Sequence, residues 1–77
     1  MLNPKVFDAL NTQLNEEASS AYLYLSMSTF LNGLNMPGMS AWMDAQVAEE
    51  TAHAKKFFVY IQSRGHQVEL LAIPQPQ

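Results

Sequence analysis

Hydrophobic residues recur in two stretches of the chain at alternating steps of three and four residues, which is the spacing of one face of an α-helix. One stripe consists of Phe7, Leu10, Leu14, Glu17, Ala21, Tyr24, Ser28 and Leu31, and the other of Met39, Met43, Gln46, Glu50, His53, Phe57 and Tyr60. Each stripe is apolar at its ends and polar in its middle. Stripes of this kind are typical of side chains that face the centre of a helical bundle.

Proline and glycine positions predict where the first helix lies. Asn3 suits the N-cap, where its side chain can accept a backbone hydrogen bond, and Pro4 suits the first helical position, which needs no N–H donor. No further proline or glycine occurs before Gly33. The spacing therefore predicts a helix over residues 4–33.

A cluster of helix breakers follows, and the next uninterrupted stretch predicts a second helix over residues 38–64, ended by Gly65. The connection is so short that the helices should fold back as an antiparallel hairpin, giving a helical domain over residues 1–65. Residues 66–77 hold two prolines and no helical period. We expect them to form an extended tail at the start of a crossover connection, with His66 exposed.

The composition fits one small domain that requires a bound metal or a partner for stability. Of the 77 residues, 48% are hydrophobic and only 14% charged, which argues against disorder, and the absence of cysteine excludes disulfides and thiolate metal sites. A chain of this size then usually needs a metal or a partner. The predicted fold class is all-α, an antiparallel two-helix hairpin that forms half of a four-helix bundle, completed by a second chain or by a missing half.

Charge and hydropathy exclude several partners. The formal net charge is −3 and the four Lys and Arg residues are scattered, so nucleic acid is not an expected partner. The N-terminus lacks the apolar run of a secretory signal, and the most apolar stretch, residues 18–34, falls short of the roughly 20 apolar residues that a membrane span needs. We expect a soluble, cytoplasmic protein without a membrane partner.

The polar centres of the two stripes should lie at the same level of the hairpin. Glu17 and His53 are equally far along the chain from residue 35, the centre of the predicted turn, and Glu50 is one helical turn nearer to it. Residues equally far from the turn face each other in an antiparallel pair. Two carboxylates and an imidazole therefore converge inside an otherwise apolar seam.

Buried carboxylates are costly, and a cation held by oxygen and imidazole ligands removes both the burial cost and their mutual repulsion. The ligand set favours iron or manganese, with zinc also competent. The alternative is a structural, hydrogen-bonded Glu–His network without metal. Glu49, one position off the stripe, is either a solvated flank or a holder of an auxiliary ion. Tyr24 is either a core residue or, beside a redox metal, a group that orients a ligand or donates an electron.

Three segments of the chain resemble the bacterial non-haem ferritins. The stretches LNTQLNEE (10–17) and SAYLYLSMS (20–28) are similar to the first helix of that family, and EETAHAKK (49–56) to the E-x-x-H motif of its second helix. Residues 68–74 are similar to the start of the long crossover that follows. The resemblance covers essentially the whole chain.

This resemblance implies a ferritin-like four-helix bundle that oxidises Fe(II) to Fe(III) at a dinuclear centre, with dioxygen or hydrogen peroxide as oxidant, and stores the product as ferric mineral in a multimeric shell. Carried over by motif, Glu17 and His53 are terminal ligands of the first iron and Glu50 bridges both irons. Tyr24 is the tyrosine beside the centre, and Glu49 matches an accessory iron position.

Two departures from the family limit what the resemblance implies. Haem-binding relatives carry a methionine directly after the bridging glutamate, whereas this chain has Thr51, so no haem is expected. The family also needs four long helices, whereas this sequence stops at Gln77 in the crossover before the third, so that it corresponds to the N-terminal half of a subunit. The missing ligands would come from a C-terminal half, or from a second copy in a symmetric dimer with four glutamates and two histidines. The alternative function is a non-catalytic helical assembly module, or a ferritin fragment, with a structural metal or hydrogen-bonded Glu–His cluster.

Overall fold

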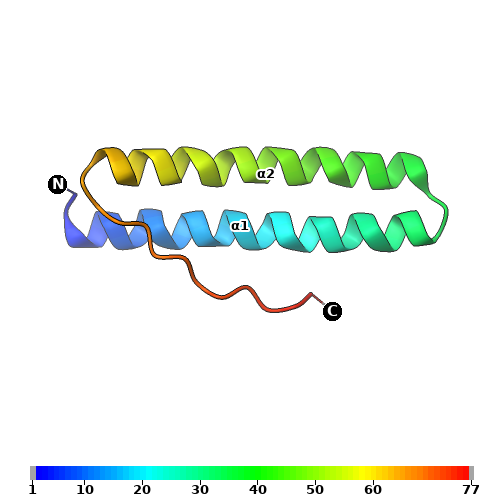
Figure 1. The fold of residues 1–77 in the computed structure, drawn as a ribbon, viewed down its shortest axis with the longest axis horizontal. Helices are drawn as coiled ribbons and strands as arrows, with labels where there is room; N and C mark the ends of the chain where they lie inside the picture. Colours follow the sequence, from blue (N-terminus) through cyan, green and yellow to red (C-terminus); the bar gives the residue numbers. More distant parts are fainter. Residues whose placement is uncertain (1, 77) are drawn as a thin grey trace.

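Two long helices, α1 (Pro4–Gly33) and α2 (Pro37–Ser63), lie side by side and antiparallel in the computed structural model, which describes residues 2–76. After α2 the chain turns back and runs as an extended tail across and along α1 (Figure 1). The extents of 49 × 20 × 14 Å are those of a layer of two helices. The predicted antiparallel hairpin, half of a four-helix bundle, is confirmed.

The start of α1 follows from its first residues. The Asn3 side chain accepts a hydrogen bond from the backbone N–H of Lys5 at 2.8 Å, and Pro4 occupies the first turn. The cap satisfies one of the free N–H groups that every helix start exposes, and the fixed φ of proline suits that first turn.

Residues with positive φ terminate the two helices. Asn35, in the connection, has φ 59°, a left-handed conformation that asparagine tolerates better than most residues. Pro37 then starts α2 one residue earlier than the spacing predicted, because proline is favourable in a first helical turn. At the other end α2 stops at Ser63, and Gly65 adopts φ 80°, which costs glycine nothing.

Small and apolar side chains fill the contact between the helices. Leu14 and Ala21 of α1 and Met43 and Ile61 of α2 are buried, and Ile61 has no exposed surface at all. Full burial of an isoleucine side chain stabilises a fold by about 1.5–3 kcal/mol. This line of contacts keeps the two helices in register over most of their length.

Near the turn the contact is polar. The buried hydroxyl of Ser40 donates to the backbone carbonyl of Ser28 at 3.1 Å, and the Ser28 hydroxyl donates to the carboxylate of Asp44 at 2.5 Å. Serine side chains are small enough for two helices to approach closely while their hydroxyls remain hydrogen-bonded. This end of the hairpin is therefore fixed by hydrogen bonds as well as by packing.

Two asparagines hold the tail on α1. The Asn11 side chain donates to the carbonyl of Glu69 at 3.0 Å and accepts from its N–H at 2.9 Å. Asn15 donates to the same carbonyl at 2.9 Å and accepts from the N–H of Leu71 at 2.8 Å. We call this pair of side chains the asparagine clamp. It supplies the extended backbone with hydrogen-bond partners that a neighbouring strand would otherwise provide.

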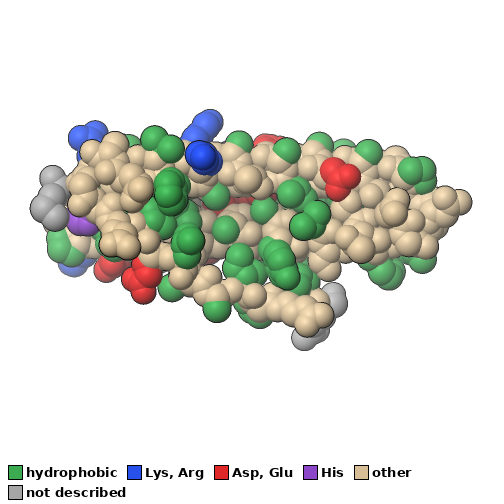
Figure 2. All heavy atoms as spheres, viewed as in Figure 1, with side chains coloured by type: hydrophobic (Ala, Val, Ile, Leu, Met, Phe, Trp, Pro, Cys, Tyr) green, Lys and Arg blue, Asp and Glu red, His purple; other side chains and the backbone are tan. Residues whose placement is uncertain are grey.

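The prediction that His66 is exposed is wrong. Its ring stacks on Phe7 with the ring centroids 4.8 Å apart, and its Nε2 atom accepts a hydrogen bond from the backbone N–H of Leu2 at 3.1 Å. The tail folds back against the start of α1, so that a residue next to a helix end in the sequence becomes part-buried. Figure 2 shows hydrophobic side chains gathered where the tail crosses the helices.

The second stripe is only partly covered. Met39 is 56% and Tyr60 43% exposed, whereas their neighbours Ser40 and Ile61 are buried. The hairpin covers only the side of α2 that faces α1, and the stripe points partly away from α1. In the described part of the chain, neither helix combines the length and the apolar character required to cross a membrane.

Candidate metal centre

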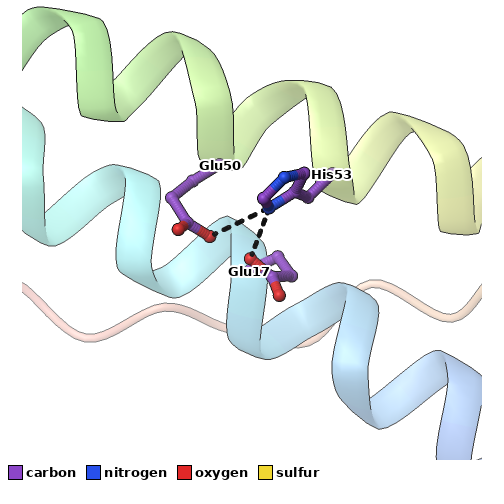
Figure 3. A group of neighbouring side chains, drawn as sticks. All are labelled: Glu17, Glu50 and His53. Atoms are coloured by element: carbon purple, nitrogen blue, oxygen red, sulfur yellow. Dashed lines mark ion pairs between the residues drawn. The ribbon is translucent and has the colours of Figure 1, made fainter.

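Glu17, Glu50 and His53 come together halfway along the hairpin (Figure 3). Glu17 projects from α1, whereas Glu50 and His53 lie one turn apart on α2 and so point to the same side of that helix. The antiparallel arrangement brings Glu17 to their level, as the equal distances from the turn predicted.

The three side chains are close enough to share one ion. The Nδ1 atom of His53 lies 3.6 Å from Oε2 of Glu17 and 3.9 Å from Oε2 of Glu50, and one ligand atom from each residue lies within 4.8 Å of the others. Two atoms bonded to one ion at about 2.1 Å are at most about 4.2 Å apart. Side-chain rotations that close the cluster by about half an ångström would therefore bring all three atoms within bonding distance of one ion.

Neither helix covers the cluster completely, and its side chains remain partly exposed to solvent. The side chains of Glu17 and Glu50 are 18% and 20% exposed, and that of His53 is 42% exposed. The helices thus shield the carboxylates while leaving a direction from which an ion and its other ligands can approach. Three side chains cannot fill the coordination shell of an iron or zinc ion alone, so further ligands must come from outside the hairpin or from solvent.

The pKa values of the two carboxyl groups shift in opposite directions because the groups hydrogen-bond each other. That bond lowers the pKa of Glu17, which is lowered further by a hydrogen bond from Gln13 and by the nearby His53. The same bond raises the pKa of Glu50, and partial burial and the negative charge of Glu17 act in the same direction. Without a cation the pair therefore retains a proton on Glu50 more readily than two isolated carboxyl groups would.

Gln13 is a member of the site that sequence reasoning missed. Its Nε2 atom donates to Oε1 of Glu17 at 2.9 Å from one turn earlier on α1. The other oxygen, Oε2, faces His53 in the cluster. The i,i+4 spacing from Glu17 was the only signal in the sequence, and it is shared by many surface pairs.

The other predicted site residues lie outside the three-residue cluster. Tyr24 is half-buried on α1, two helical turns beyond Glu17 and so about 10 Å further along the helix axis. Glu49 is exposed and points to a different side of α2 than Glu50. It contributes electrostatically, because its negative charge helps to raise the pKa of Glu50.

The donor set suits a first-row transition metal. Carboxylate oxygens and an imidazole nitrogen bind iron, manganese and zinc, and a bound cation would offset the repulsion between the two carboxylates. A two-helix hairpin with these side chains at its centre defines the class of helical-bundle proteins built around a carboxylate–histidine cluster.

Comparison with known families agrees with that class. The family model described as a ferritin-like domain matches residues 7–77, and the chain belongs to this family. It is 38% identical over all 77 residues to the bacterial non-heme ferritin of Staphylococcus saprophyticus and 39% identical to that of Campylobacter jejuni. In each case it spans 46% of the relative, or about half the length of the curated ferritins it matches.

The solved structures give the same result. The whole chain superposes on 48% of an open-pore ferritin from the archaeon Archaeoglobus fulgidus with a TM-score of 0.94 and 42% identity. For the Chlorobium tepidum ferritin, 99% of the chain superposes on 47% of that ferritin with a TM-score of 0.93 and 38% identity. The hairpin is thus similar to about half of each of these ferritin chains.

Proposed function

We propose that this chain supplies one half of an iron-oxidising centre in a ferritin-type iron-storage protein. Fe(II) is the substrate, and Glu17, Glu50 and His53 are the residues that bind it. The observation that carries the proposal is the convergence of two carboxylates and one imidazole within 4.8 Å of one another, at the centre of a ferritin-like hairpin.

Each side chain has a distinct task in this proposal. Glu17, whose pKa is lowered, is ionised and ready to bind a cation, and Gln13 holds its outer oxygen. His53 supplies an imidazole nitrogen ligand. Glu50, whose pKa is raised, releases its proton when iron binds and uses both oxygens to bridge two ions. Carboxylate ligands stabilise Fe(III) over Fe(II), which favours oxidation.

Oxidation needs two irons to act together. Two Fe(II) ions each give up one electron, and one dioxygen takes both electrons and two protons to become hydrogen peroxide, which can itself oxidise a further pair. Tyr24 and Glu49 are assigned supporting positions, the first beside the centre and the second at an accessory iron. Storage of the ferric product as a mineral requires assembly of subunits into a multimeric shell, which we include in the proposal.

The test is anaerobic titration with Fe(II), followed by admission of oxygen and measurement of the ferric absorbance. We expect saturation at about one iron per chain and rapid oxidation, since the hairpin holds half of a two-iron ligand set. Glu17→Gln should weaken binding by about 100-fold or more, because losing even an outer-shell partner typically costs about 10–100-fold. Glu16→Gln, the same change at the exposed neighbouring position, is the control and should bind normally.

The competing function is a helical assembly module with a structural metal or hydrogen-bonded cluster. Stable zinc binding without oxidation of added Fe(II) would favour that function and contradict ours. Absence of any metal binding in the presence of a correctly folded hairpin would contradict both metal-based functions.

A further inference from the structure

The end of α1 contains a reactive pair of residues that the proposed function does not use. Asn32 and Gly33 are the last two residues of that helix, at the end of the hairpin where the chain turns back (Figure 1). The sequence has five asparagines, and Asn32 is the one that a glycine follows. The residues after the other asparagines are Pro4, Thr12, Glu16 and Met36.

The reaction open to such a pair is an intramolecular substitution at the asparagine side chain. The backbone nitrogen of Gly33 gives up its proton and attacks the side-chain amide carbon of Asn32, a cyclic imide forms, and the amide nitrogen leaves as ammonia. Water then adds to either carbonyl of the ring and opens it to aspartate or to isoaspartate. No electrons are transferred, and water is the only co-reactant. Glycine favours the attack because no side chain crowds its nitrogen.

The surroundings of the pair leave the reacting atoms accessible. Both residues are exposed, so that water reaches the ring. A methyl group built on Gly33 would meet no atom within 4 Å beyond its own helix and its chain neighbours, in the part of the chain that the structure describes. Gly33 has helical geometry rather than the positive φ of Gly65. Neither packing nor conformation therefore requires glycine here, and the residue contributes a low helix propensity and an unhindered nitrogen.

The helix restrains the reaction as long as the last turn of α1 is closed. A helical ψ of about −42° holds the Gly33 nitrogen away from the side-chain carbon of Asn32, so Asn32 must leave the helix before the ring can close. The backbone N–H of Asn35 donates to the carbonyl of Asn32 at 3.0 Å, and this bond has to break. The rate of reaction therefore depends on how often the turn opens.

Few interactions hold this last turn closed. The N–H of Leu34 is shared between the carbonyls of Phe30 and Leu31, each at 3.2 Å, which is longer than the most common value of about 2.9–3.0 Å. The side chains of Phe30 and Leu34 are 66% and 53% exposed. The turn has no basic residue to offset the negative end of the helix dipole. A helix end of this kind opens far more easily than the whole fold.

We propose that Asn32 is a site of spontaneous deamidation, gated by opening of the last turn of α1, and that its conversion loosens the connection between the helices. Aspartate places a negative charge at the end of the helix where the dipole is already negative. Isoaspartate routes the backbone through the former side chain and lengthens it by a methylene group, which displaces the carbonyl that accepts from Asn35. The inference does not depend on the proposed function or on a bound metal.

The experiment is timed incubation of the intact 77-residue chain in mildly alkaline buffer, followed by peptide mapping with mass spectrometry. Asn35 is the internal control, because it is exposed in the same connection but followed by Met36. A synthetic peptide of residues 29–36, too short to form a stable helix, gives the rate without the gate. We expect conversion at Asn32 well before Asn35, at a rate in the chain about tenfold or more below that in the peptide.

The Gly33→Ala variant tests the role of the glycine without altering Asn32. Alanine adds a methyl group beside the nitrogen and, as the better helix former, makes opening of the turn about fourfold rarer. We therefore expect deamidation to slow by about fourfold or more. Gly38→Ala is the matched control, because a methyl group at Gly38 also meets no atom within 4 Å beyond its helix and neighbours in the described residues. It should leave the rate at Asn32 unchanged.

Each outcome bears on one part of the inference. Deamidation no faster at Asn32 than at Asn35, or a rate unaffected by Gly33→Ala, would overturn the site, and equal rates in the chain and the peptide would overturn the gate. The Asn32→Asp variant supplies the aspartate product directly. Faster hydrogen exchange at the Asn35 amide in this variant supports the loosened connection, and unchanged exchange contradicts it. These readouts do not involve metal binding, so failure here leaves the proposed function standing, and the converse also holds.

Discussion

We expect Asn11→Ala to release the tail while leaving both helices folded. Asn11 exchanges two hydrogen bonds with the backbone of Glu69, at 2.9 and 3.0 Å. The Glu69 carbonyl keeps its bond from Asn15, so the substitution leaves the N–H unpaired and removes one of two donors to the carbonyl. At about 0.5–1.5 kcal/mol for each hydrogen bond, the loss is about 1–2 kcal/mol. Local opening of the tail should become about 5- to 30-fold more frequent.

Hydrogen exchange at the Glu69 amide measures this opening directly. Under conditions where exchange reports the opening equilibrium, the amide should exchange about 5- to 30-fold faster in Asn11→Ala than in the unmodified chain. Asn32→Ala is the control, since it makes the same change at an exposed position of the same helix. Equal exchange rates at Glu69 in the two variants would refute the asparagine clamp.

Three further predictions concern the core and the metal cluster. Ile61→Ala should lower the free energy of unfolding by about 2–4 kcal/mol in urea melts, because Ile61 is fully buried, whereas Val59→Ala at an exposed position should change it by less than about 0.5 kcal/mol. Metal affinity, measured by Zn²⁺ titration, should decline as the pH falls through the raised pKa of Glu50, because the carboxyl group must lose its proton to bind the ion. The Glu50→Gln variant should bind Zn²⁺ more weakly and lose this pH dependence. If the variant kept the pH profile of the unmodified chain, the assignment of Glu50 would be contradicted. Gln13→Ala should raise the pKa of Glu17 toward its ordinary value and weaken Zn²⁺ binding about 3- to 10-fold, and Gln13→Glu, which repels Glu17, should weaken it further.

The sequence was sufficient to predict the helices and the pairing of their polar centres. Asn3 and Gly33 mark the ends of one long helix, and a short connection leaves an antiparallel hairpin as the only compact arrangement. Once the turn is located, counting residues places Glu17 opposite His53, where the structure has them 3.6 Å apart. These features follow from local rules that operate over a few residues or from the symmetry of the hairpin.

Contacts between distant segments could not be predicted in the same way. The clamp joins Asn11 in the first helix to Glu69 in the tail, and the ring of His66 stacks on Phe7. Both depend on the path of an extended tail, and an extended segment has no periodicity that would reveal which helix face it follows. Asparagine is common on helix surfaces, so the sequence alone does not distinguish Asn11 and Asn15 from solvated residues. Their role becomes evident only when the path of the tail is known.

The polar centre of the two stripes is best understood as a cost to stability that function requires. Leucine or methionine at Glu17 and Glu50 would continue the apolar stripes and pack against a partner without desolvating charges, and buried ion clusters replaced in this way often leave a fold equally or more stable. Instead the apolar stripes are interrupted in both helices at one level, and the two carboxyl groups shift each other's pKa in opposite directions. A break in an otherwise consistent pattern is expected where a site, rather than the fold, selects the residues.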